Sequence, residues 1–250
     1  MDSPSTSAPG EREPILVVRC GTVPYEEARA AQRRLEGERQ RGDVPDLLLL
    51  LEHPPVYTRG RRSEPAELPM GAEWYEAQGI EVRDTDRGGR VTYHGPGQLV
   101  AYPIVSLRPY GDDVHAYVRG LERVMIESLA AHGVAAGLVE GETGVWVGDR
   151  KIGSIGVHVS RGVTTHGLAV NVNNDLQPFE WVVPCGIEGC QVTSLSRELG
   201  AEQDLGAFAA TVSARFAAVF GREPIETDPA ELGVAPAGSG APPATLGDPR

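Results

Sequence analysis

The sequence predicts one α+β domain built on a β-sheet, and three observations support this fold class. Short apolar runs of strand length alternate with helical patterns, without the regular strand–helix rhythm of a barrel. The chain has 250 residues, which is enough for a sizeable core. Its apolar fraction of 40% and its charged fraction of 23% are ordinary for a globular protein.

The two ends of the chain differ in composition from the segment between them. Residues 1–13 and 227–250 are rich in Pro, Gly, Ala and Ser, with few large apolar side chains in the last part of the tail. Such segments cannot bury enough apolar surface to offset the entropy of ordering, so both are expected to be disordered. The folded catalytic domain is therefore expected to span residues 14–226.

The first elements of this domain follow in order. Residues 15–19 predict a strand, and a helix is expected to open at Pro24, to continue to about Gln40 and to stop at Gly42. The unbroken apolar run at 47–51 has the length of a strand and is typical of one covered on both faces.

The second half of the domain begins with strands at 91–93 and 99–105, on either side of a Gly-Pro-Gly turn. Apolar residues at helical spacing predict a helix over 113–132, ended by Gly133. A hairpin is expected across Gly148-Asp149, with strands at 145–147 and 151–159. Further expected elements are a strand at 166–172 and an amphipathic helix at 205–220 with Phe208, Val212, Phe216 and Val219 facing inward.

Composition narrows the classes of function. A net charge of -12 argues against general nucleic-acid binding, which needs a basic surface. No run approaches the ~20 apolar residues that cross a bilayer, and the opening stretch lacks the features of a signal peptide, so a cytoplasmic location is expected. Three cysteines are too few for a disulfide framework and are expected to be reduced.

Lys151 is the only lysine in the chain, among twenty-two arginines. An ammonium is a compact point charge whose pKa moves on burial, whereas a guanidinium is a wide fork that stays charged. The alternative is that a coding bias against lysine left a single lysine in the chain by chance. The setting favours function, because Lys151 follows a tight turn and begins a glycine-studded strand.

The densest signal is the glycine-rich segment 87–98, which has Arg87 and His94 beside four glycines. Such a loop lets the backbone approach a ligand closely and can form a slot for a thioester carbonyl or a carboxylate. The alternative is a pair of β-turns with a solvated arginine. The segment is neither a Walker loop nor a dinucleotide fingerprint.

Cys185 lies between Pro184 and Gly186, where an irregular backbone can present a nucleophile. The alternative is a small buried hydrophobe, which is how free cysteines usually behave. Cys190 raises a metal site as another alternative, but one cysteine pair is weak support for zinc, and no metal is expected. Cys20 is expected to be structural.

Cys185 and Lys151 could form a dyad in which the lysine ammonium stabilises the cysteine thiolate. A thiol with an ordinary pKa is only ~3% ionised at pH 7, and lowering that pKa by two units takes about 2.7 kcal/mol. A cation about 4 Å away in a partly screened site supplies about 4 kcal/mol. One nearby lysine is therefore sufficient to activate the thiol.

The combined motifs resemble the family of octanoyl-[acyl-carrier-protein]:protein N-octanoyltransferases, also called lipoate-protein ligase B. The resemblance covers about residues 15–220 and rests on RGGRVTYHGPGQ (87–98), KIGSIG (151–156), the segment 167–169, Pro184-Cys185-Gly186 and the segment 192–195. It implies the fold shared with biotin and lipoate ligases, a single α+β domain with mixed β-sheets flanked by helices.

The resemblance also implies an activity and its residues. An octanoyl group would move from octanoyl-acyl carrier protein to a lysine on lipoyl domains of 2-oxoacid dehydrogenase complexes or on the glycine cleavage H protein, without ATP, cofactor or metal. Cys185 would carry the S-octanoyl intermediate, and Lys151 would lower its pKa. The implied substrate-binding residues are Arg87, Gly88, Gly89, Arg90, Val91, Thr92, Tyr93, His94, Ser154, Ile155, Gly156, Gly167, Leu168 and Ala169.

Three other functions remain open at this point. They are an ATP-dependent lipoate or biotin ligase, a cysteine thioesterase, and an acyl-binding module with a buried cysteine. Acidic protein partners would need a local basic face on this acidic chain. Candidates for that face, or for an ordinary solvated surface, are Arg59, Arg61 and Arg62, together with Arg33 and Arg34.

Overall fold

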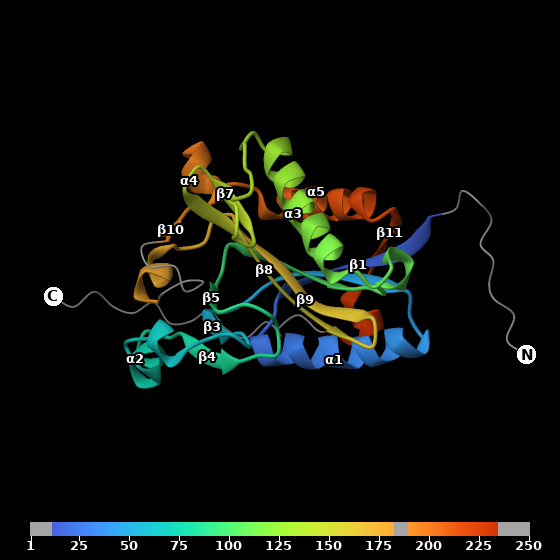
Figure 1. Ribbon diagram of the computed structural model, residues 1–250, viewed down its shortest axis with the longest axis horizontal. Helices are drawn as coiled ribbons and strands as arrows, with labels where there is room; N and C mark the ends of the chain where they lie inside the picture. Colours follow the sequence, from blue (N-terminus) through green and yellow to red (C-terminus); the bar gives the residue numbers. More distant parts are fainter. Residues whose placement is uncertain (1–11, 183–189, 235–250) are drawn as a thin grey trace, which may run out of the picture.

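The computed structural model describes residues 12–182 and 190–234, which form two β-sheets and the helices around them (Figure 1). The larger sheet has the strand order β10-β8-β9-β6-β2-β1-β11, with β7 paired to β8, and the smaller one has the order β4-β3-β5. Both sheets mix parallel and antiparallel pairs, as expected. The strands are β1 (Glu13–Thr22), β2 (Asp46–Glu52), β3 (Val56–Arg59), β4 (Glu81–Asp84), β5 (Val91–His94), β6 (Gln98–Ile104), β7 (Val145–Val147), β8 (Arg150–Ser160), β9 (Val163–Asn171), β10 (Gln191–Val192) and β11 (Arg222–Thr227).

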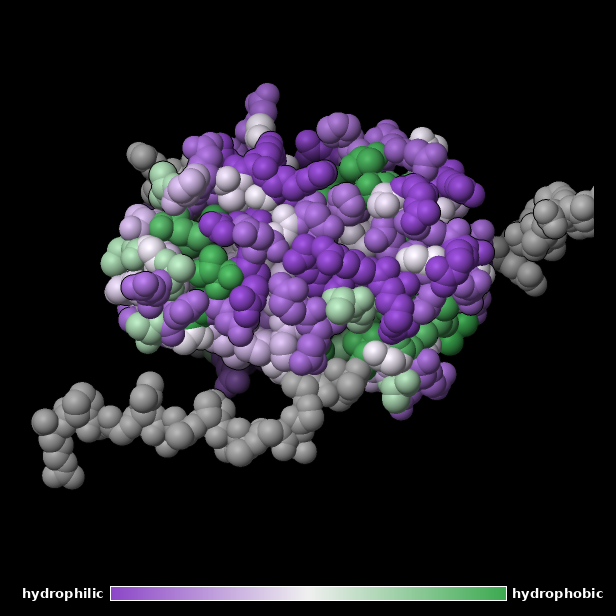
Figure 2. Space-filling model, turned by 90° about the horizontal axis from the view of Figure 1, so that it is seen from below, coloured by the Kyte–Doolittle hydropathy of each residue, from purple (hydrophilic) through white to green (hydrophobic). Residues whose placement is uncertain are grey.

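Helices cover both faces of the larger sheet. The helix α1 lies along one side, below the sheet in Figure 1, and α3 and α5 pack together on the other. The outer face around α1 is mainly hydrophilic (Figure 2). The α-helices are α1 (Tyr25–Arg41), α2 (Ala72–Ala77), α3 (Val114–Ala131), α4 (Leu195–Leu199) and α5 (Leu205–Val219), and the 3-10 helices include η1 (Pro65–Glu67), η2 (Arg108–Tyr110), η3 (Gln177–Trp181) and η5 (Pro229–Leu232).

Strand β2 shows why its sequence is apolar on both faces. Alternate side chains point to opposite faces of a sheet. Leu48 and Leu50 accordingly join the core under α3 and α5, while Leu47, Leu49 and Leu51 join the core under α1. The prediction of a strand covered on both faces is confirmed.

The first turn of α3 departs from the expected buried stripe. Asp113 caps the helix by accepting a hydrogen bond from the Ala116 amide at 2.9 Å. From Leu121 onward the stripe is buried, but Val114 is exposed and Val118 only half-buried. Both valines lie at a cavity described below, which accounts for their apolar character.

The smaller sheet packs on an aromatic cluster. Tyr57, Tyr75, Tyr93 and Phe179 form its buried centre, and the Tyr75 hydroxyl donates to the Trp181 carbonyl at 2.8 Å. The expected strands on either side of the Gly-Pro-Gly turn are present as β5 and β6, but they belong to different sheets. The turn is therefore where the chain passes from one sheet to the other.

The chain is ordered beyond residue 227, where the disordered tail was expected to begin. Residues 229–232 form η5, and Val234 is buried against the core under α1. Arg34 also donates a hydrogen bond to the Leu232 carbonyl. A few apolar residues in a polar segment are thus sufficient to dock it. Residues 1–11 and 235–250 lie outside the described residues, and no helix within 12–182 and 190–234 is long and apolar enough to span a bilayer.

Candidate active site

A cavity of about 490 Å³ collects most of the residues expected at the site. Its walls come from the glycine-rich loop and β5, from the middle of β8, from β9 and from the start of α3. The expected residues that line it are Arg87, Gly88, Gly89, Arg90, Val91, Thr92, His94, Lys151, Ser154, Ile155, Gly156, Gly167, Leu168 and Ala169. Segments far apart in the sequence therefore meet around one hollow.

Tyr93 is the described exception. Neighbouring strand residues point to opposite sides, so Thr92 and His94 face the cavity while Tyr93 faces the aromatic cluster. Tyr93, which the resemblance assigns to substrate binding, does not line the cavity, and its ring packs against Tyr57 and Phe179.

Consecutive residues of β8 line the cavity because this part of the strand is an edge. Beyond Gly153, β9 pairs with β8 on one side, and on the other side the Gly88 amide donates to the Val157 carbonyl at 2.9 Å. A Cβ atom at Gly156 would lie 2.8 Å from Arg87 Cδ and 3.0 Å from the Gly88 carbonyl oxygen. Glycine is thus required for the loop to lie against the strand.

Lys151 lies in the wall of the cavity near the beginning of β8 and is 5% exposed. Its Nζ donates a hydrogen bond to the Thr143 carbonyl at 3.0 Å and sits 5.3 Å from the centre of the Trp146 ring. Both partners orient a cation without neutralising it. The lysine therefore brings a positive charge to the wall of the cavity.

Gly144 leaves the space that the lysine side chain occupies. A Cβ atom there would lie 2.9 Å from Lys151 Cε and 2.5 Å from the Gly153 carbonyl oxygen, and the residue has a φ of +116°. The Gly144 amide donates to Oε1 of the buried Glu122 at 3.1 Å. Sequence reasoning missed Glu122 and Gly144.

Cys185 lies outside the described residues. The chain is described up to Val182 and again from Cys190. Strand β10 follows directly, with Val192 in register with Lys151, and the Thr193 amide donates to the Lys151 carbonyl at 2.9 Å. The segment that follows Cys185 in sequence is therefore bonded to the backbone of Lys151.

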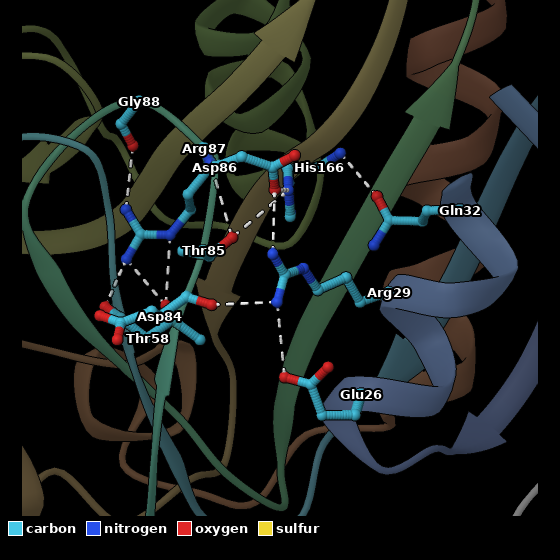
Figure 3. Close-up of polar contacts among 10 residues, drawn as sticks. All are labelled: Glu26, Arg29, Gln32, Thr58, Asp84, Thr85, Asp86, Arg87, Gly88 and His166. Atoms are coloured by element: carbon cyan, nitrogen blue, oxygen red, sulfur yellow. Dashed lines mark hydrogen bonds and ion pairs between the residues drawn. The ribbon is translucent and has the colours of Figure 1, made fainter.

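Arg87 lies against Gly156 of β8 and is held by its neighbours (Figure 3). Its Nη2 donates to the Thr58 carbonyl and hydroxyl, each at 2.7 Å, and its Nη1 donates to the Gly88 carbonyl at 2.9 Å. The guanidinium thus ties the glycine-rich loop to β3. This geometry fits a residue that positions the loop.

His94 is buried and neutral. Its Nδ1 lies 2.7 Å from Gln98 Oε1, and the Gln98 amide nitrogen donates to the Tyr93 carbonyl and to Asn171. The Gln98 oxygen must therefore accept, which places the His94 proton on Nδ1. Burial and the neighbouring His53 hold the pKa of His94 well below its usual value.

His166 also lies in the cavity wall. Its Nε2 is 3.0 Å from Asp86 Oδ1, and Arg29 approaches the same carboxylate oxygen at 3.8 Å (Figure 3). Burial lowers the pKa of His166, and the hydrogen bond from His166 lowers the pKa of Asp86.

Other lining residues carried no clear signal in the sequence. They come from α1, β6, the first turns of α3 and the turn before β7, and they become neighbours only through the fold. Val114 and Val118 belong to the apolar residues whose helical spacing predicted the helix over 113–132. The set is Tyr25, Val100, Tyr102, Val114, His115, Val118, Gly141, Glu142, Thr143 and Val157.

Comparison with solved structures agrees with this architecture. Lipoate-protein ligase A bound with ATP superimposes with a TM-score of 0.70 at 17% identity, covering 87% of this chain and 89% of that one. The putative lipoate protein ligase Ta0514 from T. acidophilum, with bound lipoic acid, gives a TM-score of 0.65 at 15% identity, covering 87% and 90%. The expected lipoate-ligase fold is confirmed.

Sequence comparison defines the class of protein. Residues 24–217 match the lipoyl protein ligase A/B catalytic domain, and the chain belongs to this family. An octanoyltransferase of Chloroflexus aurantiacus is 49% identical over 84% of this chain and 96% of its own length, and one of Rubrobacter xylanophilus is 47% identical over the same shares. Within the family, the chain is accordingly an acyltransferase of the octanoyltransferase group.

Proposed function

We propose that this enzyme moves an octanoyl group from octanoyl-acyl carrier protein to a lysine of a lipoyl domain, through an S-octanoyl intermediate on Cys185. The acceptors would be lipoyl domains of 2-oxoacid dehydrogenase complexes or the glycine cleavage H protein. The observation that carries the proposal is the buried Lys151 in the cavity wall, with the strand that follows Cys185 paired to its backbone.

The first step is a thioester exchange. The Cys185 thiolate attacks the carbonyl carbon of the donor, the bond from that carbon to the carrier sulfur breaks, and the carrier leaves as a thiol after taking up a proton. An ammonium beside the sulfur favours the thiolate over the thiol. Lys151 is the candidate for this role, because the apolar surroundings of its Nζ weaken dielectric screening.

The second step forms the amide. The neutral amine of the acceptor lysine attacks the S-octanoyl carbonyl, loses a proton, and Cys185 leaves again as a thiolate. Lys151 can pass the proton between the amine and solvent. The donor thioester already carries the activation energy for amide formation, so this chemistry consumes no ATP.

Intact mass spectrometry after mixing the enzyme with octanoyl-carrier protein tests the proposal. We expect one octanoyl adduct, absent in Cys185→Ser and slowed at least tenfold in Lys151→Ala. Cys190→Ser is the matched control and should keep the adduct. Lys151→Arg should not restore the rate, because its planar fork has a different shape and hydration.

Three outcomes would contradict the proposal. An adduct that persists in Cys185→Ser would assign the acyl group to another residue. Octanoyl transfer that requires ATP would indicate a ligase. Free octanoate as the only product in the presence of a lipoyl domain would indicate a thioesterase.

A further inference from the structure

The turn between β3 and η1 carries two adjacent arginines, one of which lies in the wall of the cavity. Arg62 lines the cavity, and both Arg61 and Arg62 are exposed to solvent. Neither was assigned a role in the transfer of the acyl group. Two features of this turn matter for binding. Its backbone is hydrogen-bonded to the glycine-rich loop, and its arginine side chains differ from nearby arginines in their ion pairs.

The backbone of this turn is fixed to the glycine-rich loop. The Arg61 amide donates to the Arg87 carbonyl at 3.0 Å, and the Arg62 amide donates to the Gly89 carbonyl at 3.1 Å. A Cβ atom at Gly60 would lie 2.4 Å from the Gly89 carbonyl oxygen, so turn and loop are in direct contact. The two arginines therefore project from an anchored backbone that shares its hydrogen bonds with the cavity wall.

Among the described residues, Arg61 and Arg62 differ from the neighbouring arginines in their ion pairs. Arg59 pairs with Asp84 at 2.8 Å, and Arg90 pairs with Glu67 at 2.5 Å. Within residues 12–182 and 190–234, no ion pair joins Arg61 or Arg62 to an acidic side chain. In a chain with a net charge of -12, two adjacent arginines of this kind form a local positive site at the cavity mouth.

The donor expected for this enzyme carries a phosphate group that these arginines could bind. An acyl group on a carrier protein is held as a thioester of a phosphopantetheine arm, and the phosphodiester at the far end is the only charged group of that arm. With the octanoyl chain in the cavity, the arm leaves through the mouth. Guanidinium groups bind phosphate with paired hydrogen bonds, whereas the acceptor lysine brings no anion.

We propose that Arg62, together with Arg61, binds the phosphodiester of the donor's phosphopantetheine arm and so makes the enzyme select phosphorylated donors. This inference rests on the proposed octanoyl transfer and adds a specificity-determining pair to it. The pair acts on donor binding, so its removal should raise KM for the donor more than it lowers kcat.

Two small donors test the inference. Octanoyl-phosphopantetheine and octanoyl-pantetheine carry the same thioester and differ only in the phosphate. For the wild-type enzyme we expect kcat/KM to be about tenfold higher with the phosphorylated donor, and the preference should shrink as salt is added. In the double variant Arg61→Ala with Arg62→Ala, the ratio between the donors should fall to about one.

The ratio is measured within one protein, so a loss of folded enzyme cancels. Arg215→Ala is the matched control, because Arg215 is an exposed arginine on α5 outside the cavity. It should keep the tenfold ratio. Arg62→Lys should give an intermediate ratio, because the charge remains but the paired geometry is lost.

Two results would overturn the inference while leaving octanoyl transfer intact. One is a wild-type enzyme that uses both donors equally, and the other is a double variant that keeps the wild-type ratio. Absence of transfer from either donor and from octanoyl-carrier protein would instead overturn the proposed function, and this inference with it.

Discussion

The two walls of the cavity are stabilised by different interactions. On the polar wall, Arg87 and His94 line the cavity and are held by hydrogen bonds to Thr58 and Gln98. On the lysine wall, Thr143 and Lys151 line the cavity, and the lysine is oriented by the Thr143 carbonyl, the Trp146 ring and the space beside Gly144. The first arrangement fixes a backbone, and the second holds a cation at the cavity.

Substituting Gly144 should have the largest effect, because it acts directly on the lysine wall. The new Cβ in Gly144→Ala would meet Lys151 Cε and the Gly153 carbonyl, so the ammonium must move. We expect kcat/KM for octanoyl transfer to fall about 100-fold, since small displacements of a catalytic group are costly. Steady-state kinetics at a temperature where the variant is folded measures this.

Gly148→Ala is the control for that substitution. Gly148 also has a positive φ, of +61°, but nothing lies within 4 Å of its Cβ position. It therefore tests a positive φ, in the milder left-handed region, without the contact with Lys151, and its activity should stay within a few-fold of wild type. Equal losses in both variants would show that strain in the turn, and not lysine position, governs the rate.

Acid should lower the stability of the protein through a buried histidine beside the polar wall. Burial lowers the pKa of His53, which contacts His94, from 6.5 to about 4. Below pH 6.5 the unfolded chain therefore takes up a proton that the folded protein does not. The stability that this histidine contributes is present above pH 6.5 and is lost as the pH falls to 4, by up to about 3 kcal/mol.

Urea unfolding at pH 7 and at pH 4.5 measures this loss. The variant His53→Asn removes the titrating group, so its free energy of unfolding should change less between the two pH values. His115→Asn, which replaces an exposed histidine, should keep the wild-type difference. An unchanged pH dependence in His53→Asn would show that the acid sensitivity arises elsewhere.

Arg87→Lys tests whether the polar wall depends on the guanidinium fork. A lysine keeps the charge but cannot reach the Thr58 and Gly88 acceptors together. We expect a loss of about 2 kcal/mol in the free energy of unfolding, because buried acceptors lose their donors. Arg33→Lys is the exposed control, and equal stability in the two variants would contradict a positioning role for Arg87.

The smallest effect is expected at Tyr93. Because its ring lies in the aromatic cluster and not at the cavity, Tyr93→Phe should leave KM for the donor within about twofold of wild type. Thr92→Val, on the neighbouring residue that does face the cavity, should change KM more. A larger effect at Tyr93 would mean that the two sheets are coupled more tightly than their separate cores indicate.

Sequence reasoning succeeded where local chemistry carries the signal. The run 47–51, the stop at Gly42 and the hairpin around Gly148 each follow from nearby residues, and the structure has them as β2, α1 and the β7–β8 pair. The glycine-rich loop and Lys151 stood out by composition, and both line the cavity. For these elements the local and the tertiary preferences agree.

What the sequence could not supply is long-range contact. Glu122 supports the turn beside Lys151 from the middle of a helix, where a carboxylate is ordinarily a solvated surface group. His166 became part of the cavity only because β9 pairs with β8. The tail was assigned by its composition, but Val234 is buried because α1 offers it a surface.

The aromatic cluster has a consequence for how substitutions in this enzyme should be read. It holds the Trp181 carbonyl through Tyr75, and the chain continues from there toward the residue proposed to carry the acyl group. A mutational screen would therefore score Tyr75 alongside residues of the reaction centre, although its ring never meets a substrate. A residue far from the reacting atoms can therefore matter for activity when it holds the backbone of a segment that leads to them.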